Sequence, residues 1–289
     1  MRTSSEILEL LLSTAREDER IRAVIMNGSR LNPNIKPDPF QDFDIVYVVS
    51  DVNSFTSDPY WIDRFGERMV MQTPDAMEGE PENSLGSFAY LLQFQDGNRI
   101  DLTLFPLANL ASLPPDSLSK TLLDKDGLLP PFPEPDESSY FPKPPTARQF
   151  TECCNEFWWV TPYAAKGLWR AQLPYAHHML DVILRDQLMK MLVWYAGVRT
   201  GFQKNIGGYE KFLQRYIDPE LWQKLERTYA GADPEQTWQA LFTMGELFRI
   251  TASTVAVHFG YPYPSQEDER VTAYLHTIHT LPRHTASLY

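Results

Sequence analysis

The sequence has little cysteine and no long hydrophobic segment, and both absences exclude classes of protein. The only two cysteines in 289 residues, Cys153 and Cys154, are adjacent, so they cannot form a disulfide framework or a zinc site. No run of about 18 apolar residues is present, and the N-terminal stretch MRTSSEILELLLSTAREDER is amphipathic and charged, unlike a signal peptide. We therefore expect a cytoplasmic protein with no membrane partner, in which the two cysteines are small core or surface residues.

Basic residues are also scarce. Lysine and arginine total 26 against 38 aspartate and glutamate residues, which gives a formal net charge of −12. Because phosphate backbones are bound by basic patches, this balance argues against nucleic acid as a partner. A negative cleft would instead attract a polycationic small molecule, and an acidic surface that serves only solubility is the alternative explanation.

Length and hydrophobic patterning predict two domains. With 289 residues, 43% of them hydrophobic and 13% aromatic, the chain exceeds the commonest size of a single core and has the composition of a folded protein. Its first part mixes helices and strands. The expected helices cover 4–19 and 60–65, and the expected strands cover 21–26, 45–49, 87–95 and 99–105.

A proline-rich segment separates this part from a helical one. Seven prolines lie between Pro130 and Pro145, a density that excludes a helix or a central strand. After it, helical periodicity predicts helices over 146–169, 175–200, 219–229, 234–259 and 267–280. We predict an α+β protein with an N-terminal mixed-sheet domain at 1–130, a linker at 131–145 and a C-terminal α-helical bundle domain at 146–289.

Three carboxylates carry the strongest chemical signal. Asp42 and Asp44 stand at the head of a strand with one residue between them, so the period of two directs both to one side. Asp101 lies in the strand RIDLTLF, on the face opposite its apolar residues. If the two strands are neighbours, the three carboxylates converge, and a divalent cation is the ordinary remedy for their repulsion. Such a cluster is what a two-metal phosphoryl or nucleotidyl transfer site requires.

A glycine-serine pair precedes these carboxylates. Gly28 and Ser29 directly follow the strand at 21–26, where a glycine lets backbone amides approach a triphosphate and a hydroxyl can donate to it. The pair alone is weak evidence, and a single aspartate is more often a turn, cap or surface residue. The order of strand, Gly-Ser, loop, Asp-x-Asp, strand and a later strand-borne aspartate favours a functional site.

These motifs resemble the nucleotidyltransferase superfamily typified by DNA polymerase beta. More closely, the segments AVIMNGSRLNPNIKPDPFQDFDIVYVV, NRIDLTLF and NEFWWVTPYAAKGLWR are similar to aminoglycoside 6-adenylyltransferases, the streptomycin-modifying enzymes, and the similarity covers nearly the whole chain. The resemblance implies a polymerase-beta-like nucleotidyltransferase domain followed by a helical acceptor-binding domain, with ATP and acceptor meeting between them.

The resemblance also implies roles for individual residues. Gly28 and Ser29 would hold the triphosphate of ATP, and two Mg²⁺ ions would be bound by Asp42 and Asp44, with Asp101 completing the site. Asp101 is the expected acceptor of the hydroxyl proton. A separate carboxylate near the acceptor is the alternative, as in related nucleotidyltransferases.

Three basic residues are candidates for the nucleotide phosphates. Arg30 follows the Gly-Ser pair, Lys190 lies in the helix expected at 175–200, and Lys204 follows that helix. Each side chain could neutralise a phosphate, and each could equally be ordinary surface charge.

The helical part carries candidates for the acceptor. Glu152 and Glu156 are four apart on one helix and form an acidic and aromatic stripe with Trp159, while Asp181 lies on the next helix. Carboxylates suit protonated amines, and an aromatic face adds cation–π attraction of roughly 0.5 to 2 kcal/mol. A solvated acidic face above a tryptophan-filled core is the alternative. The histidine pair at 177–178 points about 100 degrees apart on a helix, which favours packing or capping over a metal site.

The sequence therefore predicts a Mg²⁺-dependent adenylyltransferase that moves AMP from ATP to a hydroxyl of an aminoglycoside, releases pyrophosphate and confers antibiotic resistance. The resemblance implies a streptomycin-like acceptor modified at position 6. Two alternatives stay open: the same transfer to another small-molecule or protein hydroxyl, and a non-catalytic module that binds nucleotide or drug. The presence of Asp42, Asp44 and Asp101 argues against the second, because a degenerate enzyme would be expected to have lost at least one of them.

Overall fold

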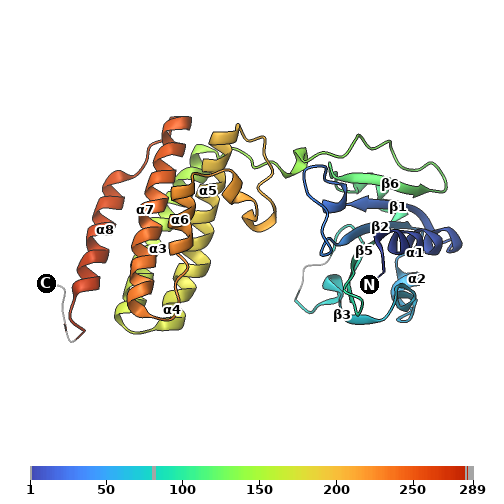
Figure 1. The fold of residues 1–289 in the computed structure, drawn as a ribbon, viewed down its shortest axis with the longest axis horizontal. Helices are drawn as coiled ribbons and strands as arrows, with labels where there is room; N and C mark the ends of the chain where they lie inside the picture. Colours follow the sequence, from blue (N-terminus) through green and yellow to red (C-terminus); the bar gives the residue numbers. More distant parts are fainter. Residues whose placement is uncertain (1, 80–82, 284, 286–289) are drawn as a thin grey trace. The chain divides into compact units, whose positions relative to one another are not determined.

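The structure, a computed structural model, describes residues 2–79, 83–283 and 285. Backbone contacts divide the chain into two compact units, residues 1–139 and 140–289, called the sheet unit and the helical unit below. Figure 1 draws the strands of the first unit and the helices of the second. Each unit has a hydrophobic core of its own. The two units are therefore described separately.

The sheet unit is built on a six-stranded mixed sheet of order β3-β4-β5-β2-β1-β6. Neighbouring strands are antiparallel except β2 and β5, which run parallel at the centre. Both faces of β2 are buried, which explains why its sequence is an almost continuous apolar run. The strands are β1 (Ile21–Asn27), β2 (Phe43–Val49), β3 (Arg68–Gln72), β4 (Phe88–Phe94), β5 (Arg99–Pro106) and β6 (Ser119–Asp124).

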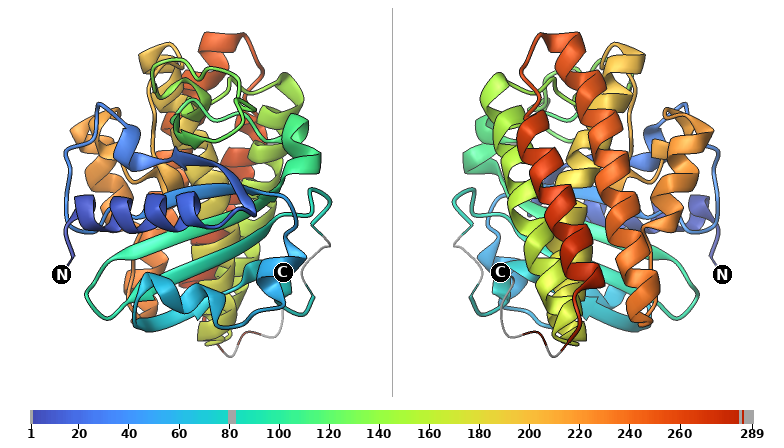
Figure 2. Two further views of the ribbon diagram at one scale, coloured as in Figure 1. Left: turned by 90° about the vertical axis from the view of Figure 1, so that its right-hand side faces the viewer. Right: turned by 90° about the vertical axis from the view of Figure 1, so that its left-hand side faces the viewer.

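Helix α1 (Ser4–Glu17) covers one face of this sheet (Figure 2). It begins with a capping box, in which the side chains of Thr3 and Glu6 each accept from the other's backbone amide. Alternate strand residues pack against α1, and the residues of opposite parity form a smaller cluster on the other face. The buried members of that second cluster are Ala23, Ile25, Val46, Val48 and Phe105.

The connections of the sheet unit contain only short helical turns within the described residues. The proline-rich segment, in which the sequence excluded a helix or central strand, contains one such turn, η5. The turns are α2 (Asn53–Thr56) and the 3₁₀ segments η1 (Ser29–Leu31), η2 (Trp61–Phe65), η3 (Pro74–Ala76), η4 (Leu107–Ser112) and η5 (Ser138–Tyr140).

The helical unit is a bundle in which α3, α7 and α8 lie side by side and α5 packs against α3 and α7 (Figure 2). Its helices are α3 (Ala147–Trp169), α4 (Leu173–His177), α5 (Arg185–Thr200), α6 (Pro219–Arg227), α7 (Pro234–Phe259) and α8 (Ser265–Thr280). Other helical segments connect them. They are the π-helical segment η6 (His178–Leu184) and the 3₁₀ turns η7 (Gly208–Glu210) and η8 (Leu213–Arg215).

The core of this bundle is aromatic. The rings of Phe157 and Phe248 stack with centroids 3.8 Å apart. Cys153 and Cys154 are buried in the same core, and burial raises the pKa of the Cys153 thiol to about 12. Of the two expectations for the cysteines, small core residues or small surface residues, the first is confirmed.

Helix α7 is the one helix in the described part of the chain that is long and apolar enough, by length and composition, to cross a membrane. In the most apolar stretch of 18 residues of this helix, 56% is buried inside the protein. A central helix of a bundle is apolar on most sides because it contacts neighbours on most sides. Its composition therefore has a packing explanation.

The α+β class predicted from the sequence is confirmed, and most predicted elements form within two residues of their expected bounds. The strands β3 and β6 were not predicted. Both are edge strands, and β3 leaves four of its five residues exposed, so it lacks the alternation that marks a half-buried strand. The helix expected at 60–65 is the 3₁₀ turn η2, and the one expected at 175–200 is α4, η6 and α5 in succession.

Candidate active site

Strand register brings the predicted carboxylates to one place on the sheet. Asp44 of β2 is the Cα partner of Asp101 in the parallel strand β5 and of Asn27 in the antiparallel strand β1. Asp44 has the parity of the buried Val46, so it lies on the face opposite α1, and Asp42 shares this parity just before β2 begins. The adjacency of the two strands, on which the sequence argument depended, is confirmed.

Arg99 lies within the group of Asp42, Asp44 and Asp101, called the Asp cluster below. Its Nε and Nη2 each lie 2.8 Å from a carboxylate oxygen of Asp101. The same Nε is 3.6 Å from Oδ2 of Asp42. The hydrogen bonds to Asp101 are the main reason why the pKa of Arg99 is raised, and the charges of the other two carboxylates add to it. A residue of the same strand thus partly neutralises the Asp cluster.

Asp44 is a strongly perturbed carboxyl. Burial, followed by the charges of Asp101 and Asp42, raises its pKa from an ordinary 3.8 to about 6, against the opposing effect of Arg99. The charged form of Asp44 is therefore disfavoured both by lost hydration and by like charge. A bound cation would relieve both effects.

The raised pKa of Asp44 predicts a pH dependence of metal-free stability. Because the folded-state pKa lies above the ordinary value, the favourable contribution of Asp44 is complete below about pH 4 and is lost as the pH rises through about 6. We therefore expect the free energy of unfolding of Asp44→Asn, relative to that of the wild type in EDTA, to be higher at about pH 8 than at about pH 4.5. The increase should be at most about 3 kcal/mol. Urea unfolding at both pH values measures this gain, and a gain that does not change with pH would contradict the prediction.

Gly28 packs directly against Asp44. Its φ of +81° lies in the region that favours glycine, and its amide donates to the carbonyl of Leu118 over 3.0 Å. A Cβ at this position would lie 2.0 Å from Oδ2 of Asp44. The close approach of the Asp44 carboxylate to the backbone is the main reason why this position requires glycine. The contact of Gly28 with a triphosphate stays a prediction.

Arg30 holds the backbone of the loop that enters β2. Its guanidinium donates to the carbonyl oxygens of Gln41 at 2.7 Å and Asp42 at 2.9 Å, and it lies 3.5 Å from the ring centroid of Phe43. The carbonyl of Ser29 accepts from the side chain of Gln41 over 3.2 Å. Arg30 and Ser29 therefore fix the position of Asp42, and their contacts with a nucleotide stay predictions.

The donor chemistry of the Asp cluster fits Mg²⁺, which binds carboxylate oxygens. As the side chains stand, no group of three or more His, Cys, Asp or Glu residues in the described ranges is arranged to hold a metal ion. At the Asp cluster, the position of Arg99 explains why the carboxylates are not arranged around a metal ion, because both oxygens of Asp101 already accept from its guanidinium. The binding of Mg²⁺ by Asp42, Asp44 and Asp101 stays a prediction.

In the helical unit, a cavity of about 530 Å³ is lined by residues of α3 and α5. The predicted acceptor residues Glu152 and Glu156 line it together with Lys190, which was a candidate for the nucleotide. Glu152 pairs with Arg148 at 2.7 Å, and Lys190 pairs with Asp186 at 2.6 Å. The remaining lining residues are Gln149, Cys153, Asn155, Gln187 and Trp194. Beside Lys190, whose charge Asp186 offsets, the two carboxylates, three amides and an indole suit a cation that carries many hydroxyls.

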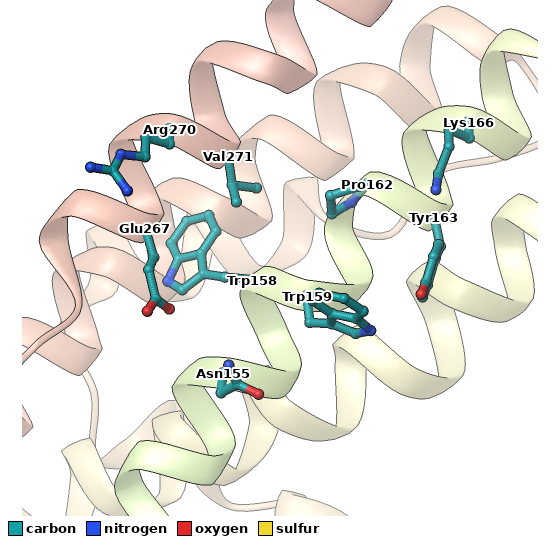
Figure 3. Close-up of a pocket in the computed structure, with 9 residues that line it drawn as sticks. All are labelled: Asn155, Trp158, Trp159, Pro162, Tyr163, Lys166, Glu267, Arg270 and Val271. Carbon is teal, nitrogen blue, oxygen red and sulfur yellow. The ribbon is translucent and has the colours of Figure 1, made fainter.

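Trp159 lines a different cavity, of about 510 Å³, formed by α3 and α8 (Figure 3). Its side chain is exposed and meets Tyr163 edge to face, with ring centroids 6.3 Å apart. Lys166 lies 4.5 Å from the centroid of Tyr163, and Glu267 and Arg270 of α8 line the same cavity. Glu152 also lines a third cavity, of about 390 Å³, together with Glu267 of α8. The predicted acidic and aromatic stripe is therefore divided among cavities on the α5 side and on the α8 side of α3. A contact of Trp159 with the acceptor stays a prediction.

Asp181 lies in the π-helical segment and belongs to a side-chain network. It hydrogen-bonds to Nδ1 of His177 at 2.6 Å and accepts from Arg185 at 3.3 Å. Arg185 also donates to the hydroxyl of Thr228 at 2.6 Å and to its carbonyl at 2.9 Å. This network connects η6 with the end of α6. Separately, Lys204 is exposed in the bend after α5. The acceptor role of Asp181 and the nucleotide role of Lys204 stay predictions.

Sequence reasoning missed Arg99 and Asn27. Arg99 lies two residues before Asp101 in β5, so the strand period that places Asp101 on the site face places Arg99 there too. Asn27 ends β1 opposite Asp44, and its side-chain oxygen accepts from the hydroxyl of Ser119 over 2.8 Å. The sequence therefore contained a signal for Arg99. It contained none for the contact of Asn27, because Ser119 belongs to β6, a strand that periodicity did not predict.

Comparisons with known proteins agree with the resemblance of the motifs. The model of a family described as streptomycin adenylyltransferase matches residues 1–278. Three similar curated proteins are each named aminoglycoside 6-adenylyltransferase. The one from Bacillus subtilis is 40% identical over 281 residues, which make up 96% of this chain and 99% of that protein. The one from Campylobacter jejuni is 41% identical over 276 residues, 95% of each chain, and the one from Staphylococcus aureus is 37% identical over 269 residues, 92% of this chain and 95% of that one.

A solved structure is also similar. It is described as an aminoglycoside 6-adenyltransferase from Bacillus subtilis and is 35% identical in sequence. The match covers 97% of this chain and 100% of that one, with a TM-score of 0.48.

Proposed function

Because the chain belongs to the streptomycin adenylyltransferase family, we propose that it transfers AMP from ATP to a hydroxyl of a streptomycin-like aminoglycoside, at position 6, and releases pyrophosphate. The observation that carries the proposal in the structure is the register of β2 with β5, which pairs Asp44 with Asp101. An added anionic group would weaken a cation that binds ribosomal RNA, so the reaction would confer antibiotic resistance from the cytoplasm.

The sheet unit would act as a polymerase-beta-like nucleotidyltransferase domain at residues 1–130, linked through 131–145 to an acceptor-binding domain at 146–289. In this proposal Gly28 and Ser29 hold the triphosphate: the absence of a side chain at Gly28 allows its close approach, and the hydroxyl of Ser29 donates to it, while the amide of Gly28 keeps its bond to Leu118. Asp101 accepts the proton of the acceptor hydroxyl as that hydroxyl attacks the α-phosphorus in line. The contacts of Arg30 with the loop support the proposal, because they hold Asp42 at the head of β2.

Two Mg²⁺ ions would be held by Asp42, Asp44 and Asp101. When bound, Mg²⁺ supplies charge neutralisation at the triphosphate and lowers the pKa of the attacking hydroxyl. The raised pKa of Asp44 supports this assignment, because it reports a buried negative charge among like charges. Lys190 and Lys204 are the further cations that we propose for the triphosphate.

The helical unit would bind the acceptor in the cavity lined by Glu152 and Glu156. Their carboxylates would pair with the guanidinium or ammonium groups of an aminoglycoside, and the amides of the same cavity would bind its hydroxyls. Trp159 and Asp181 would extend this surface on α3 and η6. A net charge of −12 supports a cationic acceptor, because it would draw such a molecule toward the protein.

Replacing Glu156 by glutamine tests the acceptor assignment. Since one charge-assisted hydrogen bond contributes about 1–2 kcal/mol, we expect the KM for streptomycin to rise roughly 5- to 30-fold while the KM for ATP stays unchanged. Steady-state kinetics with each substrate varied in turn measures both values. Glu269→Gln, an exposed position on α8, is the matched control and is expected to change neither. An equal rise in both KM values would show that Glu156 supports the fold and does not bind the acceptor.

The reaction itself is tested by incubating the protein with ATP, Mg²⁺ and a panel of aminoglycosides, with mass spectrometry of the products. We expect streptomycin to gain one AMP and the gain to disappear in EDTA. Adenylylation of a different small molecule or of a protein would favour the alternative acceptor. Binding of ATP or drug without any adenylylated product would favour the non-catalytic module.

A further inference from the structure

Two arginines contact the Asp cluster, and the protein holds them in different ways. Arg30 is anchored by two backbone carbonyls, by the hydroxyl of Ser4 at 3.1 Å and by the ring of Phe43. Arg99 is held by carboxylates, and its side chain is 41% exposed. Arg30 is therefore part of the loop before β2, whereas Arg99 can turn toward solvent without disturbing the core.

The guanidinium of Arg99 occupies the oxygens that the site would need for another cation. It bonds to both oxygens of Asp101 and approaches Asp42, so it spans two of the three carboxylates. A divalent cation at the same oxygens would lie within a few ångströms of a fixed positive charge, and that repulsion is strong in a partly buried site. A metal ion at Asp101 would therefore compete with the guanidinium of Arg99 for this carboxylate.

We infer that Arg99 is an exchangeable cation that occupies the carboxylates in the free protein and passes to the triphosphate when Mg-ATP binds. The inference rests on the proposed function. In the free protein, Arg99 offsets the repulsion among the three carboxylates. In the complex, Asp101 turns to the metal, and the released guanidinium, two residues away on the same strand, binds phosphate oxygens through the planar fork that suits them. The exchange keeps Asp101 paired with a cation in both states.

This exchange predicts effects of opposite sign on two ligands. In Arg99→Gln, Mn²⁺ alone should bind roughly tenfold more tightly, because no resident charge competes for the carboxylates. Mg-ATP should bind roughly tenfold more weakly, because one phosphate contact is lost. Electron paramagnetic resonance of free Mn²⁺ measures the first affinity, and calorimetry with Mg²⁺ and a non-hydrolysable ATP analogue measures the second. Arg99→Lys, which keeps the charge without the fork, should fall between the wild type and Arg99→Gln for both ligands.

Arg22→Gln is the matched control, because Arg22 makes a similar two-pronged pair with Asp126 away from the Asp cluster. It should leave both affinities unchanged. Weaker binding of both ligands by Arg99→Gln, or an unchanged Mn²⁺ affinity, would overturn the exchange and make Arg99 a residue that orders Asp101. The wild-type adenylylation assay is read separately: its failure with an intact Mn²⁺ response would reject the proposed function and leave the competition between Arg99 and metal supported.

Discussion

Replacing Asp44 by asparagine is expected to lower turnover by about three orders of magnitude or more and to leave the metal-free fold at least as stable as the wild type. Asn is nearly isosteric with Asp, so the packing against Gly28 is kept while one negative charge is removed from the Asp cluster. Losing a buried charge among like charges does not weaken the apo fold. Losing a metal ligand removes both charge neutralisation and activation of the nucleophile.

Thermal melting with and without Mg-ATP separates these two effects. The wild type should gain stability from the ligand by mass action, and Asp44→Asn should gain much less. Asp51→Asn, an exposed aspartate of the same unit, is the control and should match the wild type in turnover and in ligand response. If Asp44→Asn turned over at the wild-type rate, or unfolded without ligand, Asp44 would be a structural residue and the site assignment would be wrong.

Gly28→Ala is expected to abolish most activity through geometry alone. An alanine Cβ would lie 2.0 Å from Oδ2 of Asp44, well inside contact distance, so the carboxylate or the loop must move. The positive φ adds backbone strain on the order of 1–3 kcal/mol. We expect a loss of stability of about that size and a fall in turnover of about a hundredfold or more, since a displacement of about an ångström at a reacting group is costly.

Gly127→Ala is the control that isolates the clash. Gly127 also has a positive φ, of +64°, but a Cβ there meets nothing within 4 Å. It should lose some stability from strain and keep its turnover. Circular dichroism melts and single-turnover kinetics on both variants make the comparison. Equal losses of turnover would show that backbone strain, and not the position of Asp44, limits the reaction.

Much of the chemistry of this protein was present in local sequence pattern. The period of two in β5 assigned Asp101 to the face opposite the apolar residues, and the same period applied to Asp44 in β2 and to Asp42 just before it. Helix bounds were predictable because helices depend on residues three and four apart, as for α7, which begins and ends where periodicity placed it. The family was recognisable for the same reason, since its motifs are short and contiguous.

Other features depended on which segments the fold brings together. The approach of Arg99 to Asp42 and the contact of Gly28 with Asp44 are set by side-chain geometry between residues that the chain pattern treats separately. The edge strands β3 and β6 form because neighbouring strands offer unpaired backbone groups, and their own sequences carry little signal of it.

The helical unit shows the same division. Sequence spacing placed Glu152, Glu156 and Trp159 on one stripe of α3, but the packing of α5 and α8 on either side assigned them to different cavities. The sequence by itself determined the element types, the parity of the carboxylates and the family, because these depend on near neighbours along the chain. Only the tertiary structure decided the approach of Arg99 to Asp42, the need for glycine at Gly28 and the walls of each cavity, because these depend on contacts between distant segments.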